Sequence, residues 1–338
     1  MRTLIQSLLV LSFAFFIAGT AIASEREARS AAAQAIDRAI PVMEKSLAEY
    51  PKHNTCFSCH HHGVPSLALE LAAQRGHPVG AGTLLAIQKH TNGDLKTDID
   101  LYRKGQGQPG GVTRAGYALF ALQSTDQPRS EITDAVVGFL LKKDSDLGRW
   151  RGASNRPPSE KSDFTNTFLS IRALKTFAES SDKDAATARI DAARKWLESA
   201  EPKDTEDRVF QLWGLKEAGA AESLIKADAL ALKGQQREDG GWAQLPDAAS
   251  DAYATGSVLT ALLITGELKP DDSACARAVQ YLLKQQQPDG SWHVVSRSKP
   301  VQPYFESGFP YGRDQFISIL ATGWATAALA LTEPKAPR

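Results

Sequence analysis

The chain is poor in the two sulfur-containing amino acids. Its 338 residues include three cysteines and two methionines. Cys56, Cys59 and Cys275 are too few for a domain that is held together by a framework of disulfides. Cys275 occupies an apolar position in a helical pattern, so we interpret it as a small core residue.

An excess of charge of either sign is also missing. The 39 Lys and Arg residues balance the 39 Asp and Glu residues, which gives a formal net charge of zero. Proteins that bind nucleic acid or anionic membranes through their overall field carry a basic excess. We therefore expect no nucleic-acid partner.

The start of the chain is typical of a cleaved signal peptide. Residues 1–23 combine one basic residue, a short apolar run and the small-x-small pattern Ala21-Ile22-Ala23, which predicts cleavage before Ser24. The apolar run is short and is interrupted by Gln6 and Ser7, so we expect no transmembrane anchor. This interpretation predicts a periplasmic or secreted protein.

No convincing run of alternating apolar and polar residues indicates a strand. Apolar residues instead recur at helical spacing, as in Ile36, Ile40, Met43 and Leu47. The pattern predicts an all-α fold.

One loop sequence recurs along the chain. "KGQQREDGGWAQ" (233–244) returns as "LKQQQPDGSWHV" (283–294), with a weaker copy at 142–152 and a vestige at 104–114. A new helix follows each clear copy, so the unit is two helices in about 45–50 residues, which indicates stacked helical repeats. The repeats can form an open solenoid or a closed ring. Small residues in Ala254-Thr255-Gly256 and Ala321-Thr322-Gly323 allow helices to pack closely and favour a ring. The helices with these small residues would lie inside, and longer helices would lie outside.

The Gln-x5-Trp loops, from Gln236 to Trp242 and from Gln286 to Trp292, resemble the QW repeats of squalene-hopene cyclases and related prenyltransferase-type α/α toroids. The resemblance implies an (α/α) toroid, in which the glutamines cap helix ends and the tryptophans pack onto the neighbouring repeat. We divide the chain into a signal peptide (1–23), an N-terminal helix with the Cys/His segment (24–62), a toroid (63–332) and a tail (333–338).

The acid that the family uses for catalysis is not obvious. Squalene-hopene cyclases protonate an alkene with the middle Asp of Asp-x-Asp-Asp-Thr. The best match that we identify is Asp163-Phe164-Thr165-Asn166-Thr167, where Thr165 holds the donor's position. A hydroxyl cannot protonate an alkene, so we predict no squalene cyclisation. Asp163, Asp251 and Asp314 are weak catalytic candidates, and the simpler interpretation is that all three cap helices.

Other toroid chemistries match no better. The Asp-x-Cys zinc pair of protein prenyltransferases would fall on Asp251-Ala252-Tyr253, which lacks the cysteine, and the complement-type thioester motif is absent. The aromatic segment 302–316 is open to two interpretations. It lines the mouth of a cavity, or it covers the core.

The segment "NTCFSCHHHG" (54–63) contains Cys56-x-x-Cys59-His60, which matches the attachment signature of haem c. Both thiols can add to the haem vinyl groups, and His60 would be the proximal iron ligand. Predicted export agrees with haem attachment outside the cytoplasm. A plain disulfide, and a zinc or copper ion held by Cys56, Cys59 and the histidines 60–62, stay open as alternatives. A thioredoxin-like site requires a βαβ setting, which the sequence lacks.

A distal iron ligand would have to be histidine, because no methionine follows the motif. His77 and His90 are weak candidates, and an open site is the alternative. The combined patterns predict an exported toroid with haem c that acts in electron transfer, redox sensing or oxidation of an apolar ligand, with a redox protein as partner. The alternative is a terpene-cyclase-like enzyme, or a binding scaffold, with a structural Cys/His metal site.

Overall fold

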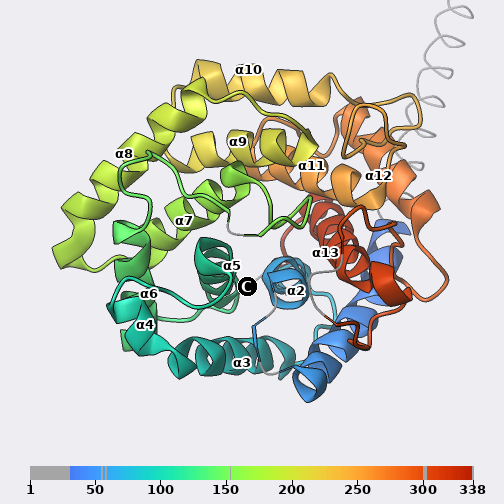
Figure 1. Cartoon of the computed structure of the whole chain (residues 1–338). Helices are drawn as coiled ribbons and strands as arrows, with labels where there is room; N and C mark the ends of the chain where they lie inside the picture. Colours follow the sequence, from blue (N-terminus) through green and yellow to red (C-terminus); the bar gives the residue numbers. More distant parts are fainter. Residues whose placement is uncertain (1–30, 55, 58, 153, 300–302, 337–338) are drawn as a thin grey trace, which may run out of the picture.

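The computed structural model describes residues 31–54, 56–57, 59–152, 154–299 and 303–336. The predicted signal peptide lies outside these residues. No strand occurs in the described part of the chain, which confirms the all-α prediction. Two sets of helices can be followed in Figure 1. The inner set is α2 (Val64–Ala73), α5 (Gly111–Ser124), α7 (Asp163–Phe177), α9 (Thr205–Glu217), α11 (Ala252–Thr265) and α13 (Gln315–Thr332). The outer set is residues 31–53, α3 (Thr83–Thr97), α6 (Glu131–Lys142), α8 (Lys183–Ser199), α10 (Glu222–Lys233) and α12 (Ser273–Gln285).

Four short elements complete the described chain. They are η1 (Cys59–Gly63), α4 (Ile99–Arg103), η2 (Ser180–Asp182) and η3 (Gly312–Asp314). The first of these, η1, is a single π-helical turn that leads directly into α2. Such wide turns in helices are frequent at functional sites.

The inner helices form a closed ring. Each packs against the next in the order α2, α5, α7, α9, α11, α13, and α13 packs back against α2 (Figure 1). The small residues explain why these helices can come so close. A Cβ atom on Gly256 would lie 2.7 Å from the backbone of Ala325, and one on Gly323 would lie 3.0 Å from Val64 Cγ1. The ring with small-faced helices inside is therefore confirmed, and the open solenoid is wrong.

The three repeat loops hold their tryptophans in the same way. The indole Nε1 of Trp150, Trp242 and Trp292 donates to the carbonyl ten residues earlier, at 2.8, 2.9 and 2.7 Å. All three rings are fully buried. Trp242 and Trp292 thus occupy equivalent positions, as predicted, and the weaker copy at 142–152 belongs to the same series.

The glutamines of the repeat tie each loop to the next outer helix. Gln236 Nε2 donates to the Ala274 carbonyl in α12, and Gln286 Nε2 donates to the Ala35 carbonyl, both at 2.8 Å. The second bond joins the last repeat loop to helix 31–53. That helix is therefore part of the outer ring, and its apolar face, which includes Met43, is buried.

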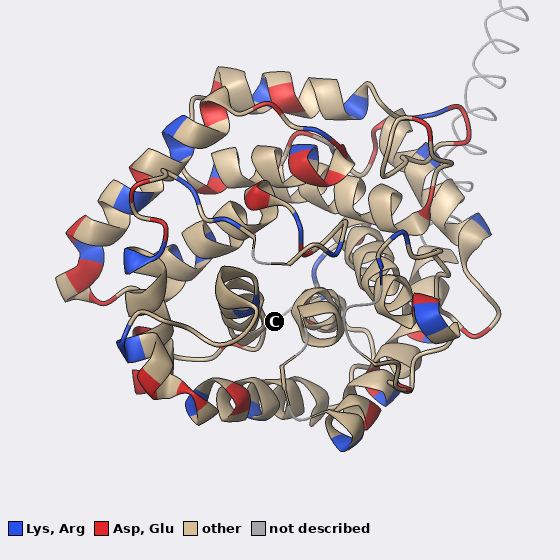
Figure 2. Ribbon diagram, viewed as in Figure 1, with Lys and Arg blue, Asp and Glu red and all other residues tan. Residues whose placement is uncertain are grey.

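Charged residues are distributed unequally between the inner and outer helices. Figure 2 shows the Lys, Arg, Asp and Glu residues mainly on the outer helices and the loops. Within the described residues, one segment, Gly312–Thr332, is long and apolar enough to cross a membrane, but 89 % of its apolar 18-residue stretch is buried inside the protein. Its apolar sequence is explained by its place in the inner wall as α13.

Candidate functional site

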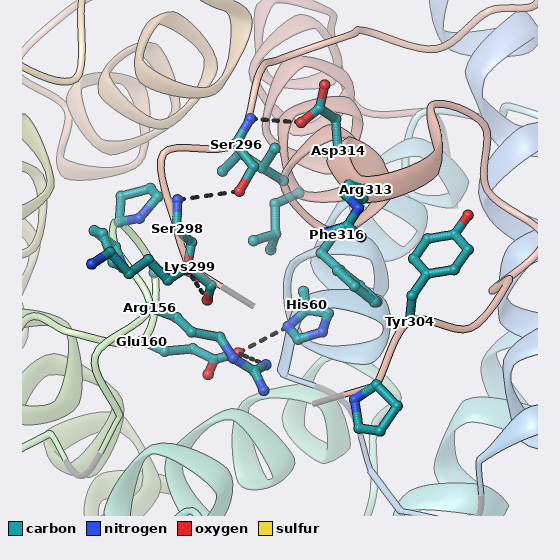
Figure 3. Close-up of a pocket in the computed structure, with 16 residues that line it drawn as sticks. His60, Arg156, Glu160, Ser296, Ser298, Lys299, Tyr304, Arg313, Asp314 and Phe316 are labelled. Atoms are coloured by element: carbon teal, nitrogen blue, oxygen red, sulfur yellow. Dashed lines mark hydrogen bonds and ion pairs between the residues drawn. The ribbon is translucent and has the colours of Figure 1, made fainter. Parts of the chain in front are cut away.

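Three of the inner helices, α2, α7 and α13, begin around a cavity at one end of the ring. The cavity has a volume of about 530 Å³ and is lined by residues from η1, from the loop before α7 and from the segment that leads into α13 (Figure 3). At the opposite end, the tail lies against the end of α2, where the Ala336 amide donates to the Gln74 carbonyl at 3.0 Å. The cavity is therefore at the end where the helix dipoles favour negative charge.

A buried histidine–carboxylate pair lies in the wall of this cavity. His60 Nδ1 is 2.8 Å from Glu160 Oε1, and the two residues are each 6 % exposed (Figure 3). Burial raises the pKa of Glu160, but the hydrogen bond and charge of His60, with the charge of Arg156, outweigh burial and hold the pKa below its usual value. Glu160 is thus a carboxylate that orients the His60 ring.

The rest of the lining combines an apolar floor with basic groups. Phe316, Ile317 and Leu320 contribute apolar surface from the first turns of α13. Arg156, Lys299 and Arg313 also line the cavity, and only Arg156 forms an ion pair with a described residue, Glu160, at 3.5 Å. Because three cations face two carboxylates there, Glu160 and Asp314, the cavity attracts an anionic group. Tyr304, Arg313, Asp314 and Phe316 in this lining favour the cavity-mouth interpretation of segment 302–316, of which residues 303–316 are described.

The three candidate aspartates lie in different places. Asp314 lines the cavity and accepts from the Ser296 amide at 2.8 Å. Asp251 caps α11 by accepting from the Ala254 amide at 2.9 Å. Asp163 accepts from the Gly152 amide at 3.0 Å, while the cap of α7 is Ser162. The capping interpretation is therefore right for Asp251 and wrong for Asp163 and Asp314, whose carboxylates bond to loop amides instead.

A buried acid that the sequence analysis missed lies beside Thr165. Glu206, in the first turn of α9, is 3 % exposed and accepts from Thr165 Oγ1 at 3.0 Å and from Tyr253 Oη at 2.9 Å. Burial, together with the nearby charge of Asp204, raises its pKa to about 8, although the two hydrogen bonds oppose the shift. The raised pKa favours the protonated form of Glu206 near neutral pH.

A sequence signal for Glu206 was present. Asp204-Thr205-Glu206-Asp207 has acids at the first, third and fourth positions, which is the spacing of Asp-x-Asp-Asp with a glutamate in the middle. The segment that begins at Asp163 is the start of the preceding inner helix, α7. The two segments meet in space through the Thr165–Glu206 hydrogen bond.

Aromatic rings fill the interior of the ring next to Glu206. Phe168, Phe210, Trp213 and Trp324 come from three inner helices, α7, α9 and α13, and lie with neighbouring ring centroids 4.5 to 6.4 Å apart. The guanidinium of Arg172 stacks over Phe168 and Trp213 at 5.7 and 5.5 Å. The interior thus already holds one cation against its aromatic faces.

The Cys/His segment borders two separate spaces, because His60 lines the central cavity and Cys56 lines a groove elsewhere. Cys56 lines a separate open groove of about 610 Å³ outside the ring, together with His90, whose Nε2 is 3.3 Å from the Cys56 carbonyl. His90 also stacks on His62 with ring centroids 4.6 Å apart. His77 lies elsewhere, and both of its ring nitrogens contact carboxylates, at 2.7 Å from Asp37 Oδ1 and 2.8 Å from Glu333 Oε2.

This arrangement bears on how a haem would fit. Cys56 lines the outer groove and His60 lines the central cavity, so the first thiol and the proposed proximal imidazole do not face a common space. Cys59 packs against the core, with Sγ 3.9 Å from the Thr113 carbonyl. The described conformation therefore does not present these groups to one haem. Among the described residues, no group of three or more His, Cys, Asp or Glu side chains is placed to hold a metal ion.

Comparison with known proteins gives the fold its context. No protein-family model and no curated protein matches the chain. A type II terpene cyclase from Scytonema, solved with geranylgeranyl dihydroxybenzoate, is 14% identical over 91% of this chain and 99% of that chain, with a TM-score of 0.54. The fold is a terpene-cyclase-like α/α toroid.

Two further structures agree at the level of the fold. A protein from Actinoplanes is 13% identical over 89% of this chain and 99% of that chain, with a TM-score of 0.56. The ent-copalyl diphosphate synthase from Streptomyces platensis is 17% identical over 81% of this chain and 50% of that chain, with a TM-score of 0.52. At these identities the comparisons establish the architecture of the terpene-cyclase-like toroid.

Proposed function

We propose that this terpene-cyclase-like toroid binds an amphiphilic ligand, with an apolar isoprenoid-like chain and an anionic head, and acts on it by proton transfer at His60. The observation that carries the proposal is the buried His60–Glu160 pair in the wall of the cavity. When Nδ1–H is donated to Glu160, Nε2 is the ring nitrogen that can act as the base. A general base that is oriented by a carboxylate is a recurrent catalytic arrangement.

The residues that line the cavity suggest the chemistry of the two ends of the ligand. Phe316, Ile317 and Leu320 suit an apolar chain, and the solved terpene cyclase of the same fold was obtained with a geranylgeranyl compound. Lys299 and Arg313 suit a carboxylate or phosphate head, because neither forms an ion pair with another described residue. His60 would take a proton from a ligand hydroxyl or a water, and Glu160 would stabilise the resulting imidazolium.

Binding is tested with a matched pair of ligands. A prenyl carboxylic acid and the prenyl alcohol of the same chain length are titrated into the protein, and binding is followed by calorimetry. We expect the acid to bind about tenfold more tightly at low salt and the advantage to shrink as salt is added. The double variant Lys299→Gln, Arg313→Gln should bind both compounds alike. Equal binding of acid and alcohol by the unaltered protein would contradict the proposed head group.

Proton transfer is tested by product analysis after incubation with the ligand that binds. His60→Gln and Glu160→Gln should each lower turnover, by about 10²-fold for His60, while the dissociation constant changes little. Glu238→Gln, which is exposed and outside the cavity, is the control. Turnover that survives in His60→Gln would mean that His60 is not the base.

A covalent haem on Cys56 and Cys59 is the second candidate. Cys56-x-x-Cys59-His60 supports it, and so does the contact of His60 Nδ1 with Glu160, because metal-ligating histidines donate their other nitrogen to such partners. Cys56, Cys59 and His60 are the residues that would hold a haem, with His90 as a candidate further ligand, and the haem would supply redox chemistry, although His60 and Cys56 do not face a common space in the described conformation. A visible spectrum and an intact mass of exported protein test this candidate, and metal analysis of colourless protein tests zinc. Export of the protein and a redox partner protein are further proposals that rest on the sequence.

A further inference from the structure

A second pocket lies beside α9, apart from the central cavity. It is about 320 Å³ in volume and lies between the segment that leads into α9 and the repeat loop that follows α10. We call it the α9 pocket. No described residue lines both this pocket and the central cavity, so its role does not depend on the function proposed above.

The charged side chains that line the α9 pocket are mainly basic. Lys203, Arg208 and Arg237 share the lining with one carboxylate, Asp204, so the lining has an excess of two positive charges. Asp204 forms an ion pair at 3.4 Å with Arg297, which is outside the lining. None of the three cations forms an ion pair within the described part of the chain. Because cations without counter-charges in a concave site raise the local potential, the pocket attracts an anion.

Two further acids act on these cations from outside the lining. Burial raises the pKa of both Asp207 and Asp228, and the charges of Lys203 and Arg208 oppose the two shifts. Neither carboxylate lines the pocket. They therefore reduce the positive potential from a distance but do not fill the place of a ligand.

Arg237 is held in position without a counter-charge. Its Nη1 donates to the Ala248 carbonyl, and its Nη2 donates to the Pro246 carbonyl at 2.9 Å. These carbonyls fix the guanidinium but leave its full charge, and a guanidinium has further N–H donors for a ligand. A cation that is already ordered loses little conformational entropy when an anion binds.

The arginine is not required by the repeat loop itself. Gln287 occupies the equivalent position in the last repeat loop. The two backbones bond alike, because the Arg237 amide donates to the Gly241 carbonyl at 3.0 Å and the Gln287 amide donates to the Ser291 carbonyl at 2.9 Å. The turn therefore forms with an uncharged side chain, and its conformation does not explain the charge of Arg237.

We infer that the α9 pocket binds a small phosphate monoester. A phosphate monoester carries about two negative charges near neutral pH, which matches the excess of two positive charges in the lining. Guanidinium groups pair with phosphate oxygens through parallel N–H donors. A single carboxylate has half this charge and would leave part of the excess uncompensated.

The rest of the lining indicates the size and polarity of the ligand. Ala243, Leu245 and Pro246 add apolar surface. A volume of about 320 Å³ is at the small end of the range for ligand pockets. The group esterified to the phosphate should therefore be small and partly apolar, as a phenyl ring is.

The test compares phenyl phosphate, phenyl sulfate and inorganic phosphate in calorimetric titrations at low salt and neutral pH. The host protein is the full chain with Lys299→Gln and Arg313→Gln, two exposed positions, which removes the unpaired cations of the central cavity. We expect phenyl phosphate to bind about tenfold more tightly than phenyl sulfate, which has the same shape but a single charge. Inorganic phosphate should also bind more weakly, because it lacks the apolar ring. Added salt should weaken all three.

Variants in the same host locate the site. Arg208→Gln should weaken phenyl phosphate binding about tenfold, and Arg237→Lys, which keeps the charge but loses the fork of donors, about threefold. Lys226→Gln removes an exposed cation of α10 outside the lining and is the matched control, which should bind as the host does. A far-UV circular dichroism spectrum of each variant separates loss of binding from loss of the fold.

Four results would overturn the inference. Phenyl sulfate or inorganic phosphate binds the host as tightly as phenyl phosphate, which removes the match of charge or of the apolar group. A folded Arg208→Gln variant binds phenyl phosphate as the host does, which places the anion elsewhere. The host binds no phenyl phosphate while the unaltered protein does, which places the anion in the central cavity. Neither protein binds phenyl phosphate, which leaves the α9 pocket without this ligand.

Discussion

At the scale of single residues, the ring holds two buried carboxyl groups in opposite states, Glu160 in the wall of the cavity and Glu206 beside Thr165. Glu160 is a carboxylate because His60 and Arg156 stabilise its charge. Glu206 is a neutral acid because burial and Asp204 destabilise its charge. Groups whose environments push their pKa values apart are the usual pattern of acid–base sites.

The pair of His60 and Glu160 should stabilise the fold only while Glu160 is charged. A carboxyl group whose pKa is lowered on folding adds stability above its unfolded value and loses it as pH falls through the folded value. We expect the wild type to exceed Glu160→Gln by about 1–3 kcal/mol at pH 6 and the difference to shrink below about pH 4. Urea unfolding from pH 3 to 6 measures this. The exposed Glu238→Gln is the control, and a difference that grows in acid would contradict the assignment.

Glu206 should have the opposite pH dependence. Its folded pKa of about 8 lies above the unfolded value, so its contribution is complete below about pH 4 and is lost as pH rises to 8. Glu206→Gln should therefore match the wild type near pH 4 and be more stable above pH 8, by up to about 5 kcal/mol. Thermal unfolding across this range tests the sign, with the exposed Glu201→Gln as control. Parallel curves for wild type and Glu206→Gln would show that Glu206 is charged throughout.

The raised pKa of Glu206 also bears on the prediction about squalene. A carboxyl group with a pKa of about 8 holds its proton at neutral pH but is a weak acid for an isolated alkene. We still expect no hopene-type product when the pure protein is incubated with squalene. Formation of such a product that is lost in Glu206→Gln would show that Glu206 has replaced the family's aspartate.

At the scale of elements, the repeats could be predicted and the site could not. The Gln-x5-Trp loops recur in the sequence, and the indole of each donates to a carbonyl only ten residues earlier, as Trp242 does to Leu232. The pair of His60 and Glu160 joins residues 100 positions apart. Nothing in the local sequence of either residue indicates the other, because their meeting depends on how the ring closes.

Two glycines with positive φ test how the last repeat loop packs on helix 31–53. Gly290 has φ +92°, and a Cβ atom there would lie 2.2 Å from the Arg38 carbonyl oxygen. Gly266 has φ +80°, but a Cβ atom there would meet nothing within 4 Å. Gly266→Ala should cost about 1–2 kcal/mol from the backbone alone, and Gly290→Ala should cost at least about 3 kcal/mol because the loop must also move away from helix 31–53. Equal losses on urea unfolding would mean that the loop does not pack there.

At the scale of the whole molecule, helix 31–53 completes the ring from the outside. It contacts the last repeat loop through Ala35, and its Glu44 accepts from the Gly80 amide at 2.7 Å, just before α3. Tyr50, near its end, packs against His61 and Phe305 with ring centroids 4.8 and 5.7 Å apart. The boundary drawn at residue 62 from the sequence therefore falls within packed structure, inside one helical segment that runs from η1 into α2.

Because the ring is closed, helix 31–53 should unfold with the rest of the molecule. Met43 and Leu259 are both fully buried, the first in this helix and the second in α11 on the inner wall. Met43→Ala and Leu259→Ala should each cost about 2–5 kcal/mol and lower the midpoint of one shared transition, since a cooperative unit loses stability wherever its core is damaged. Hydrogen exchange gives an independent measure, because amides of helix 31–53 should be protected as well as those of α11. An early separate transition in Met43→Ala, or fast exchange confined to residues 31–53, would mean that this helix docks onto a ring that is stable without it.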